Sequence, residues 1–277
     1  MNEIALSNNS KFDISTSKLL TGVGKTWFFV AFIGQLFFAV YISAFYGIST
    51  IKGDFELWNK VLPNGYVPGD TFGNFMVGLH VLFAILITVC GPLQLTPKIR
   101  TSFPKFHRVN GRIYLLTALI MSVGGLYMVI TRGTVGAPIT HVSIGINAIL
   151  IMIFAYQTVR FAIARKINVH NLWAIRLFLV VSGVWFYRVG LMLWMTIHQA
   201  PVGFDMESFT GPFLTFLSFS SYLLPLLVFE LYRWIKTKNH VFSNVFMSIC
   251  MIVITLGMAI GILAAGMGMW LPRIVNA

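Results

Sequence analysis

Charged residues are scarce in this 277-residue chain: only 10% of its residues are Asp, Glu, Lys or Arg, whereas 57% are hydrophobic. Such a composition offers too little polar surface to cover a soluble globule of this length. Acidic residues are the scarcest, with 8 against 20 lysines and arginines. A basic nucleic-acid-binding module would gather its cations on one face, but here they lie between apolar runs, which argues against a nucleic-acid partner. The composition therefore predicts an integral membrane protein.

Cysteine is almost absent as well. Cys90 and Cys250 both lie within apolar runs and form no CxxC pair, so the sequence supports neither a disulfide framework nor a cysteine metal site. The first 24 residues also lack the apolar core of a cleavable signal peptide. We expect residues 1–24 to form a cytoplasmic tail and residues 25–277 to form one transmembrane domain.

Seven apolar stretches are each long enough to cross a bilayer, which takes about 20 residues of α-helix. They lie at residues 26–48, 73–96, 104–131, 140–163, 171–197, 211–234 and 243–270. The predicted fold is an all-α bundle of seven transmembrane helices, with the second to fifth helices as its core.

The distribution of charge predicts the topology of this bundle. Most basic residues lie in the N-terminal tail and in the segments after the second, fourth and sixth helices, whereas Lys52, Lys60, Arg132 and Arg273 lie on the opposite side with most of the acids. The positive-inside rule then places the N-terminus in the cytoplasm and the C-terminus outside. We expect the long loop 49–72 to form a cap on the outer surface.

Four of the six histidines fall one to a helix on the second to fifth predicted helices. His80 and His141 lie toward the outer side, and His107 and His170 lie toward the inner side. Two imidazoles on facing helices provide the axial ligands of a six-coordinate b-type haem, which transfers one electron at a time. We therefore predict two bis-histidine haem sites that carry electrons across the membrane, with a quinone or a redox protein as partner. The oligomeric state cannot be read from the sequence.

Residues near these histidines support the same hypothesis. Gly111 and Gly145 follow His107 and His141 at i+4, where the missing side chain would let a flat ligand approach. The cofactor-binding candidates also include the cations Arg108, Arg112, Arg176 and Arg188. Arg188 follows His170 by five helical turns and, in a straight helix, would point the same way at greater depth.

The inner pair is the better supported of the two. His107 and His170 both lie in the first turn of their helices, so they share a depth, whereas His80 lies deeper in its helix than His141 by about 9 Å at ~1.5 Å per residue. The alternative for His107 and His170 is an interfacial role, binding lipid phosphate in a basic helix start.

Two other functions stay open. His80 and Arg188 are ionisable groups within apolar helices, a position that is costly without a partner. In a haem-free transporter or binding protein they would hold an anion, a quinone or a lipid, or relay protons. In an enzyme acting at the cytoplasmic face, His107 would be the acid or base and the nearby arginines would bind phosphate.

Three motifs carry a family resemblance. Gly91-Pro-Leu-Gln94, His107-Arg-Val-Asn-Gly-Arg-Ile-Tyr114 and His170-Asn-Leu-Trp-Ala-Ile-Arg176, with the later Arg188, are similar to the GPLQ, HRxxGRxY and HxxWMIR pattern of a bacterial family of predicted membrane proteins, domain of unknown function 2306. The resemblance implies a multi-pass protein of the bacterial inner membrane but no activity. The helix and histidine layout also resembles that of cytochrome b561.

Overall fold

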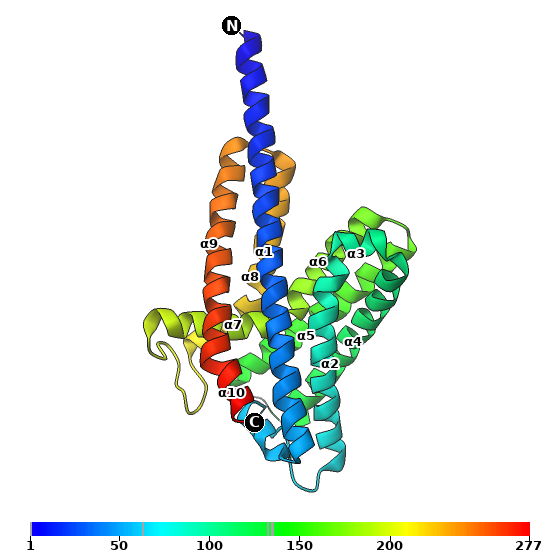
Figure 1. The fold of residues 1–277 in the computed structure, drawn as a ribbon, viewed down its shortest axis with the longest axis vertical. Coiled ribbons are helices and arrows are strands. Elements are labelled where there is room, and N and C mark those ends of the chain that lie inside the picture. Colours follow the sequence, from blue (N-terminus) through cyan, green and yellow to red (C-terminus); the bar gives the residue numbers. More distant parts are fainter. Residues whose placement is uncertain (1, 63, 132, 134–135) are drawn as a thin grey trace.

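Figure 1 shows the computed structural model, which describes residues 2–62, 64–131, 133 and 136–277, with side chains from Ile14 onward. Every regular element within these residues is a helix, so the predicted all-α class is confirmed. Arg132, assigned above to the outer side, lies outside the described residues. The elements are α1 (Asn2–Lys52), η1 (Phe55–Lys60), α2 (Thr71–Leu95), α3 (Pro97–Ser102), α4 (Pro104–Thr131), α5 (Pro138–Ile163), α6 (Ile167–Val181), α7 (Gly183–His198), α8 (Pro212–Lys238), α9 (Val241–Ala265), η2 (Gly266–Trp270) and α10 (Leu271–Val275).

Six stretches of helix are long and apolar enough to cross a membrane, namely Ile14–Lys52, Thr71–Leu95, Pro104–Thr131, Pro138–Ile163, Pro212–Lys238 and Val241–Val275. The pair α6 and α7 adds a seventh if it forms one span. The predicted membrane bundle is thus confirmed. The predicted N-terminal tail is helical from Asn2 onward and continues into the first span, while the side of the membrane on which it lies stays a prediction.

The prediction of one straight helix over residues 171–197 is wrong. The helix breaks at Ser182, and α6 and α7 meet at a bend of 52°. A Ser-Gly pair stands at the break, which is a frequent cause of helix kinks. Polar side chains bind the groups at the break: Asn147 Nδ2 donates to the Val180 carbonyl at 3.2 Å, and Gln35 Nε2 donates to Ser182 Oγ at 2.8 Å. Neighbouring helices therefore stabilise the bend.

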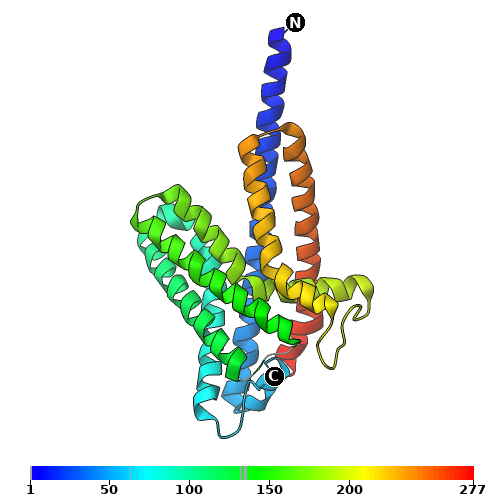
Figure 2. The same cartoon turned by 180° about the vertical axis from the view of Figure 1, so that it is seen from behind.

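The helices form two groups, which Figures 1 and 2 show from opposite sides. In one group, α2 packs on α4, α4 on α5, α5 on α6, and α6 touches α2. The diagonal pairs of this four-helix group are therefore α2 with α5 and α4 with α6. The other group contains α1, α8 and α9, and α7 runs across it. The diagonal pairs are the helices on which the sequence placed its two histidine pairs.

Buried side chains gather in both groups rather than only in the predicted core of helices two to five. The largest cluster surrounds α1 and includes Phe38, Tyr41, Phe45 and Trp270. It forms because glycine lets the helices approach closely: a Cβ at Gly34 would lie 2.7 Å from Trp185 Cζ2. A second cluster joins the four-helix group to α8 and includes Cys90, Tyr114 and Leu177 of that group and Tyr222 of α8.

The predicted cap loop folds back onto the helices beside it. Trp58 of η1 is buried, and its indole nitrogen donates to Ser49 Oγ at 2.9 Å. Its ring meets Tyr46 of α1 edge to face at 5.6 Å. The loop therefore packs on the end of α1, whereas the side of the membrane that it covers stays a prediction.

Candidate functional site

The structure brings the two inner histidines together. His107 lies in the first turn of α4, after Pro104, and His170 lies in the first turn of α6. They are near enough for a positive charge on one imidazole to repel a positive charge on the other. The four-helix group thus places both rings at the same end of one diagonal. Iron ligation by this pair stays a prediction.

The ring of His170 is held by a backbone group of α5. Its Nδ1 lies 2.9 Å from the carbonyl oxygen of Thr158. A carbonyl only accepts, so Nδ1 carries the proton, and a neutral ring then has a bare Nε2. An imidazole that donates one N–H to a backbone carbonyl is oriented for metal binding through its other nitrogen. His170 therefore has the hydrogen bonding of a metal ligand.

The ring of His107 belongs to a network of amides. Buried Asn110 donates through Nδ2 to the Cys90 carbonyl and to Gln94 Oε1, each at 3.0 Å. The Gln94 amide nitrogen then faces His107 and lies 3.3 Å from its Nε2. With Gln94 as donor, Nε2 accepts and the ring proton is on Nδ1. This Nδ1 is buried and lacks a hydrogen-bond partner among the described residues.

Gly111 lies beside the same network. A Cβ there would lie 2.6 Å from Gln94 Nε2, so the space next to Gly111 is taken by the end of the Gln94 side chain. The GPLQ segment therefore supplies an amide to His107, and α2 continues through Pro92 to Leu95 instead of stopping at the proline. Asn110, which organises the network, escaped the sequence analysis. The available signal was an asparagine at i+3 from His107, on the same face of the helix.

The outer histidines are arranged differently. His80 lines a small pocket between α2 and α4, together with Met121, Gly124 and Met128 of α4. His141 has a buried Nε2 with no hydrogen-bond partner in the described part of the chain, and no described atom within 4 Å would meet a Cβ at Gly145. Among the described residues, no hydrogen bond or ring contact joins His80 to His141. The outer pair thus has a free ring nitrogen and open space on α5, but no contact between its two members.

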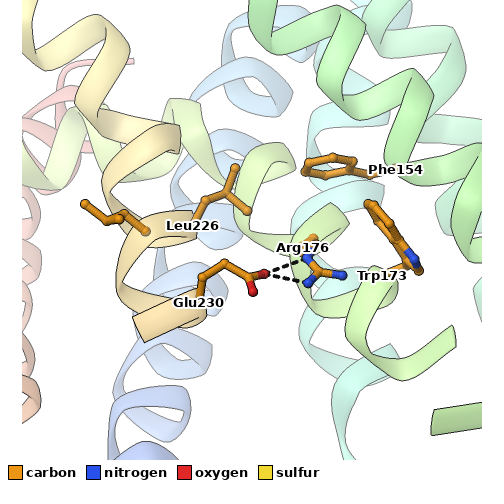
Figure 3. Close-up of a pocket in the computed structure, with 6 residues that line it drawn as sticks. Phe154, Trp173, Arg176, Leu226 and Glu230 are labelled. Atoms are coloured by element: carbon orange, nitrogen blue, oxygen red, sulfur yellow. Dashed lines mark hydrogen bonds and ion pairs between the residues drawn. The ribbon is translucent and has the colours of Figure 1, made fainter. Parts of the chain in front are cut away.

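The inner arginines take two different positions. Arg176 of α6 binds Glu230 of α8, with 2.7 Å between Nη2 and Oε1, and its guanidinium lies 4.5 Å from the ring centre of Trp173. Figure 3 shows this ion pair in a pocket of about 370 Å³ that Phe154 also lines. Arg176 is therefore already neutralised inside the protein. Two further cofactor-binding candidates are exposed on α4, namely Arg108 and Arg112.

Arg188 lies on α7, beyond the bend, so its predicted alignment with His170 along one straight helix is wrong. It is half-buried, donates through Nη1 to the Val184 carbonyl at 3.2 Å, and lies 5.4 Å from the ring centre of Phe38. It lies within electrostatic reach of His80, the other residue that the sequence proposed for an anion site. Arg273 of α10, which the sequence analysis did not single out, also interacts with Arg188.

The described residues contain no cluster of three or more His, Cys, Asp or Glu side chains that could hold a metal ion. The possible metal ligands are therefore a pair of imidazoles. A haem iron needs at most two ligands from the protein, since the porphyrin supplies the other four.

The fold and these sites define a multi-pass α-helical membrane protein with histidines in a four-helix group. Residues 77–207 match the family model described as predicted membrane protein (DUF2306), so the resemblance found in the motifs is confirmed for this segment. The match runs from α2 to the loop after α7 and includes the four candidate histidines and Arg188, but not Arg273. Neither the curated proteins nor the solved structures gave a match.

Proposed function

We propose that this protein is a transmembrane b-type haem protein that transfers electrons across the bacterial inner membrane, with His107 and His170 as the ligands of an inner haem. The observation that carries the proposal is that these two imidazoles lie within electrostatic reach of each other, in the first turns of the diagonal helices α4 and α6. His170 has its Nδ1 held by a backbone carbonyl, which leaves Nε2 for a metal. In His107 the nitrogen with the lone pair is Nε2, which faces the Gln94 amide and would be free for a metal once that side chain turns away.

The residues around the inner pair fit such a group. Gly111 leaves a place beside His107 that only the flexible end of Gln94 fills, so a rotation of one side chain would open it. Asn110 would keep α2 and α4 together through its bond to the Cys90 carbonyl. The haem would supply a one-electron redox centre. The protein itself would orient the two imidazoles, and the buried cluster around Tyr114 would exclude water from them.

His80 and His141 are proposed as ligands of a second, outer haem. The free buried Nε2 of His141 and the open space beside Gly145 support the proposal on the α5 side. On the α2 side, His80 faces α4, so its ring would have to turn toward α5. A quinone or a redox protein is the proposed electron-transfer partner.

Spectroscopy of detergent-purified protein tests the haem proposal. We expect a b-type band in the reduced-minus-oxidised spectrum and a positive pyridine haemochrome assay. His107→Ala and His170→Ala should each lose that band, whereas the exposed His240→Ala should keep it. Size-exclusion profiles would show that each variant is folded. A wild-type protein without a b-type band, after growth with added haem precursor, would refute the proposal.

A second candidate is a haem-free membrane protein that binds or transports an anion through His80 and Arg188. The interaction of these two side chains favours it, as does the break between α6 and α7. Broken helices near substrate sites recur in secondary transporters. A folded wild type that lacks haem but binds an anion, with binding lost in Arg188→Gln, would favour this candidate.

A further inference from the structure

We propose that Arg188 and Arg273 together bind an oxyanion, the carboxylate or phosphate group of a small molecule or of a lipid. The inference rests on the anion site at Arg188 that the second candidate function proposes, and it deepens that proposal because it names the ligand class and adds a binding residue from α10. It does not depend on whether haem is bound.

Both guanidinium groups lie against the same face of α1. Arg188 lies over the ring of Phe38 at 5.4 Å, and Arg273 Nη1 donates to the hydroxyl of Tyr41 at 3.3 Å. Phe38 and Tyr41 are one turn apart, with ring centroids separated by 6.0 Å. The two cations therefore converge from α7 and α10 on one short stretch of α1.

These cations lack a counter-charge. Among the residues that the structure describes, neither Arg188 nor Arg273 forms an ion pair with a carboxylate, and each has one hydrogen bond within the protein. Their charges repel each other. His80 lies within electrostatic reach of Arg188 and would add a third positive charge when protonated. An anion between the two guanidinium groups would relieve the repulsion.

The remaining hydrogen-bonding capacity suits an oxyanion. Each guanidinium has five N–H donors in a planar fork that binds the two oxygens of a carboxylate or phosphate side by side. The hydroxyl groups of Tyr41, Tyr46 and Tyr187 lie within electrostatic reach of Arg188 and would offer further polar contacts to a bound oxyanion. Both arginines are half-buried.

The wall behind the site is rigid. Tyr41 and Trp270 are almost completely buried and stack with an interplanar angle of 16°. Trp270 ends a π-helical turn, Gly266–Trp270, and such turns occur often at functional sites. A Cβ at Gly266 would overlap Phe37, so this turn packs directly against α1. The packing sets the direction of α10 and therefore the position of Arg273.

Thermal unfolding of the detergent-purified full chain, followed by tryptophan fluorescence, tests this site. One arm titrates inorganic phosphate against chloride at constant ionic strength. The other adds phosphatidylglycerol or, as the uncharged-lipid control, phosphatidylcholine to the micelles. We expect a saturable rise in Tm for the wild type in at least one arm, and the arm that responds identifies the source of the oxyanion.

The variants Arg188→Gln and Arg273→Gln should each weaken the response at least tenfold in midpoint concentration. Arg188→Lys and Arg273→Lys keep the charge but lose the planar fork, so they should weaken the Tm response less than the glutamine variants do. They replace the glutamine variants in the test if one of those fails to fold. The control Arg160→Gln removes the same charge from an exposed position on α5 and should respond like the wild type.

Two outcomes would overturn the inference: no response of the wild type in either arm, or an equal response in wild type and in both Arg188 and Arg273 variants. The haemochrome assay on the same samples separates this result from the haem proposal. An oxyanion response without a b-type band leaves the inference standing and refutes the haem. A b-type band without an oxyanion response refutes this inference alone.

Discussion

The ion pair between Arg176 and Glu230 should help to hold the two helix groups together, because it joins α6 of one group to α8 of the other. Its closest atoms are 2.7 Å apart, and the side chains of Arg176 and Glu230 are 15% and 37% exposed. Glu230 also binds Arg233 at 2.8 Å, but Arg233 is its neighbour on the same helix and is 43% exposed. The two arginines therefore form a matched comparison.

Two unit charges about 4 Å apart attract by about 4 kcal/mol at an effective dielectric constant of ~20. Partial exposure of Glu230 and its sharing between two arginines reduce this value, so we expect a coupling of about 2 to 3 kcal/mol between Glu230 and Arg176. For Glu230 and Arg233 we expect about 0.3 to 0.5 kcal/mol, the range of pairs within one helix.

Double-mutant cycles with Glu230→Gln, Arg176→Gln and Arg233→Gln measure both couplings, using unfolding in mixed micelles with increasing dodecyl sulfate. Glu230→Gln should destabilise most among the single variants, since it leaves Arg176 without its anion. The reasoning would be refuted by a Glu230–Arg176 coupling below about 0.5 kcal/mol, or by a larger coupling to Arg233 than to Arg176.

Three further predictions concern packing, polar contacts and pH. Gly261→Ala should lower the free energy of unfolding by about 1 to 3 kcal/mol, since the new Cβ would lie 2.8 Å from a methyl group of Val189 on α7. The control Gly124→Ala adds a Cβ with no described atom within 4 Å, so in the same micelle unfolding assay it should be neutral or stabilising. Asn110→Leu removes one buried and one partly buried hydrogen bond and should lower the free energy of unfolding by about 1 to 3 kcal/mol. An unchanged unfolding midpoint would contradict the amide network. Hydrogen bonds from the Ser208 backbone and hydroxyl lower the pKa of Asp205. The carboxylate therefore stabilises its turn above the pKa of the unfolded chain and loses this effect as the pH falls through the folded pKa, below about pH 4. Asp205→Asn should abolish this pH dependence in hydrogen exchange of the loop.

The sequence by itself determined the fold class and most helix positions. Runs of apolar residues longer than about 20 can only be satisfied as membrane-spanning helices, since each backbone group must be bonded within its own segment. The motifs around His107 and His170 likewise sufficed for the family resemblance and placed both residues in first turns. These are local properties, set by residues close together in the chain.

Only the tertiary structure decided which polar groups meet. The bend at Ser182 depends on Gln35 and Asn147, which come from two other helices. Arg273 lies near Arg188 because α10 continues the chain after a π-helical turn that packs against α1, which no apolar pattern reveals. Contacts of this kind join residues far apart in sequence, and their energies depend on the distances that helix packing sets. For that reason the sequence could nominate charged residues for a site but could not say which of them are already neutralised.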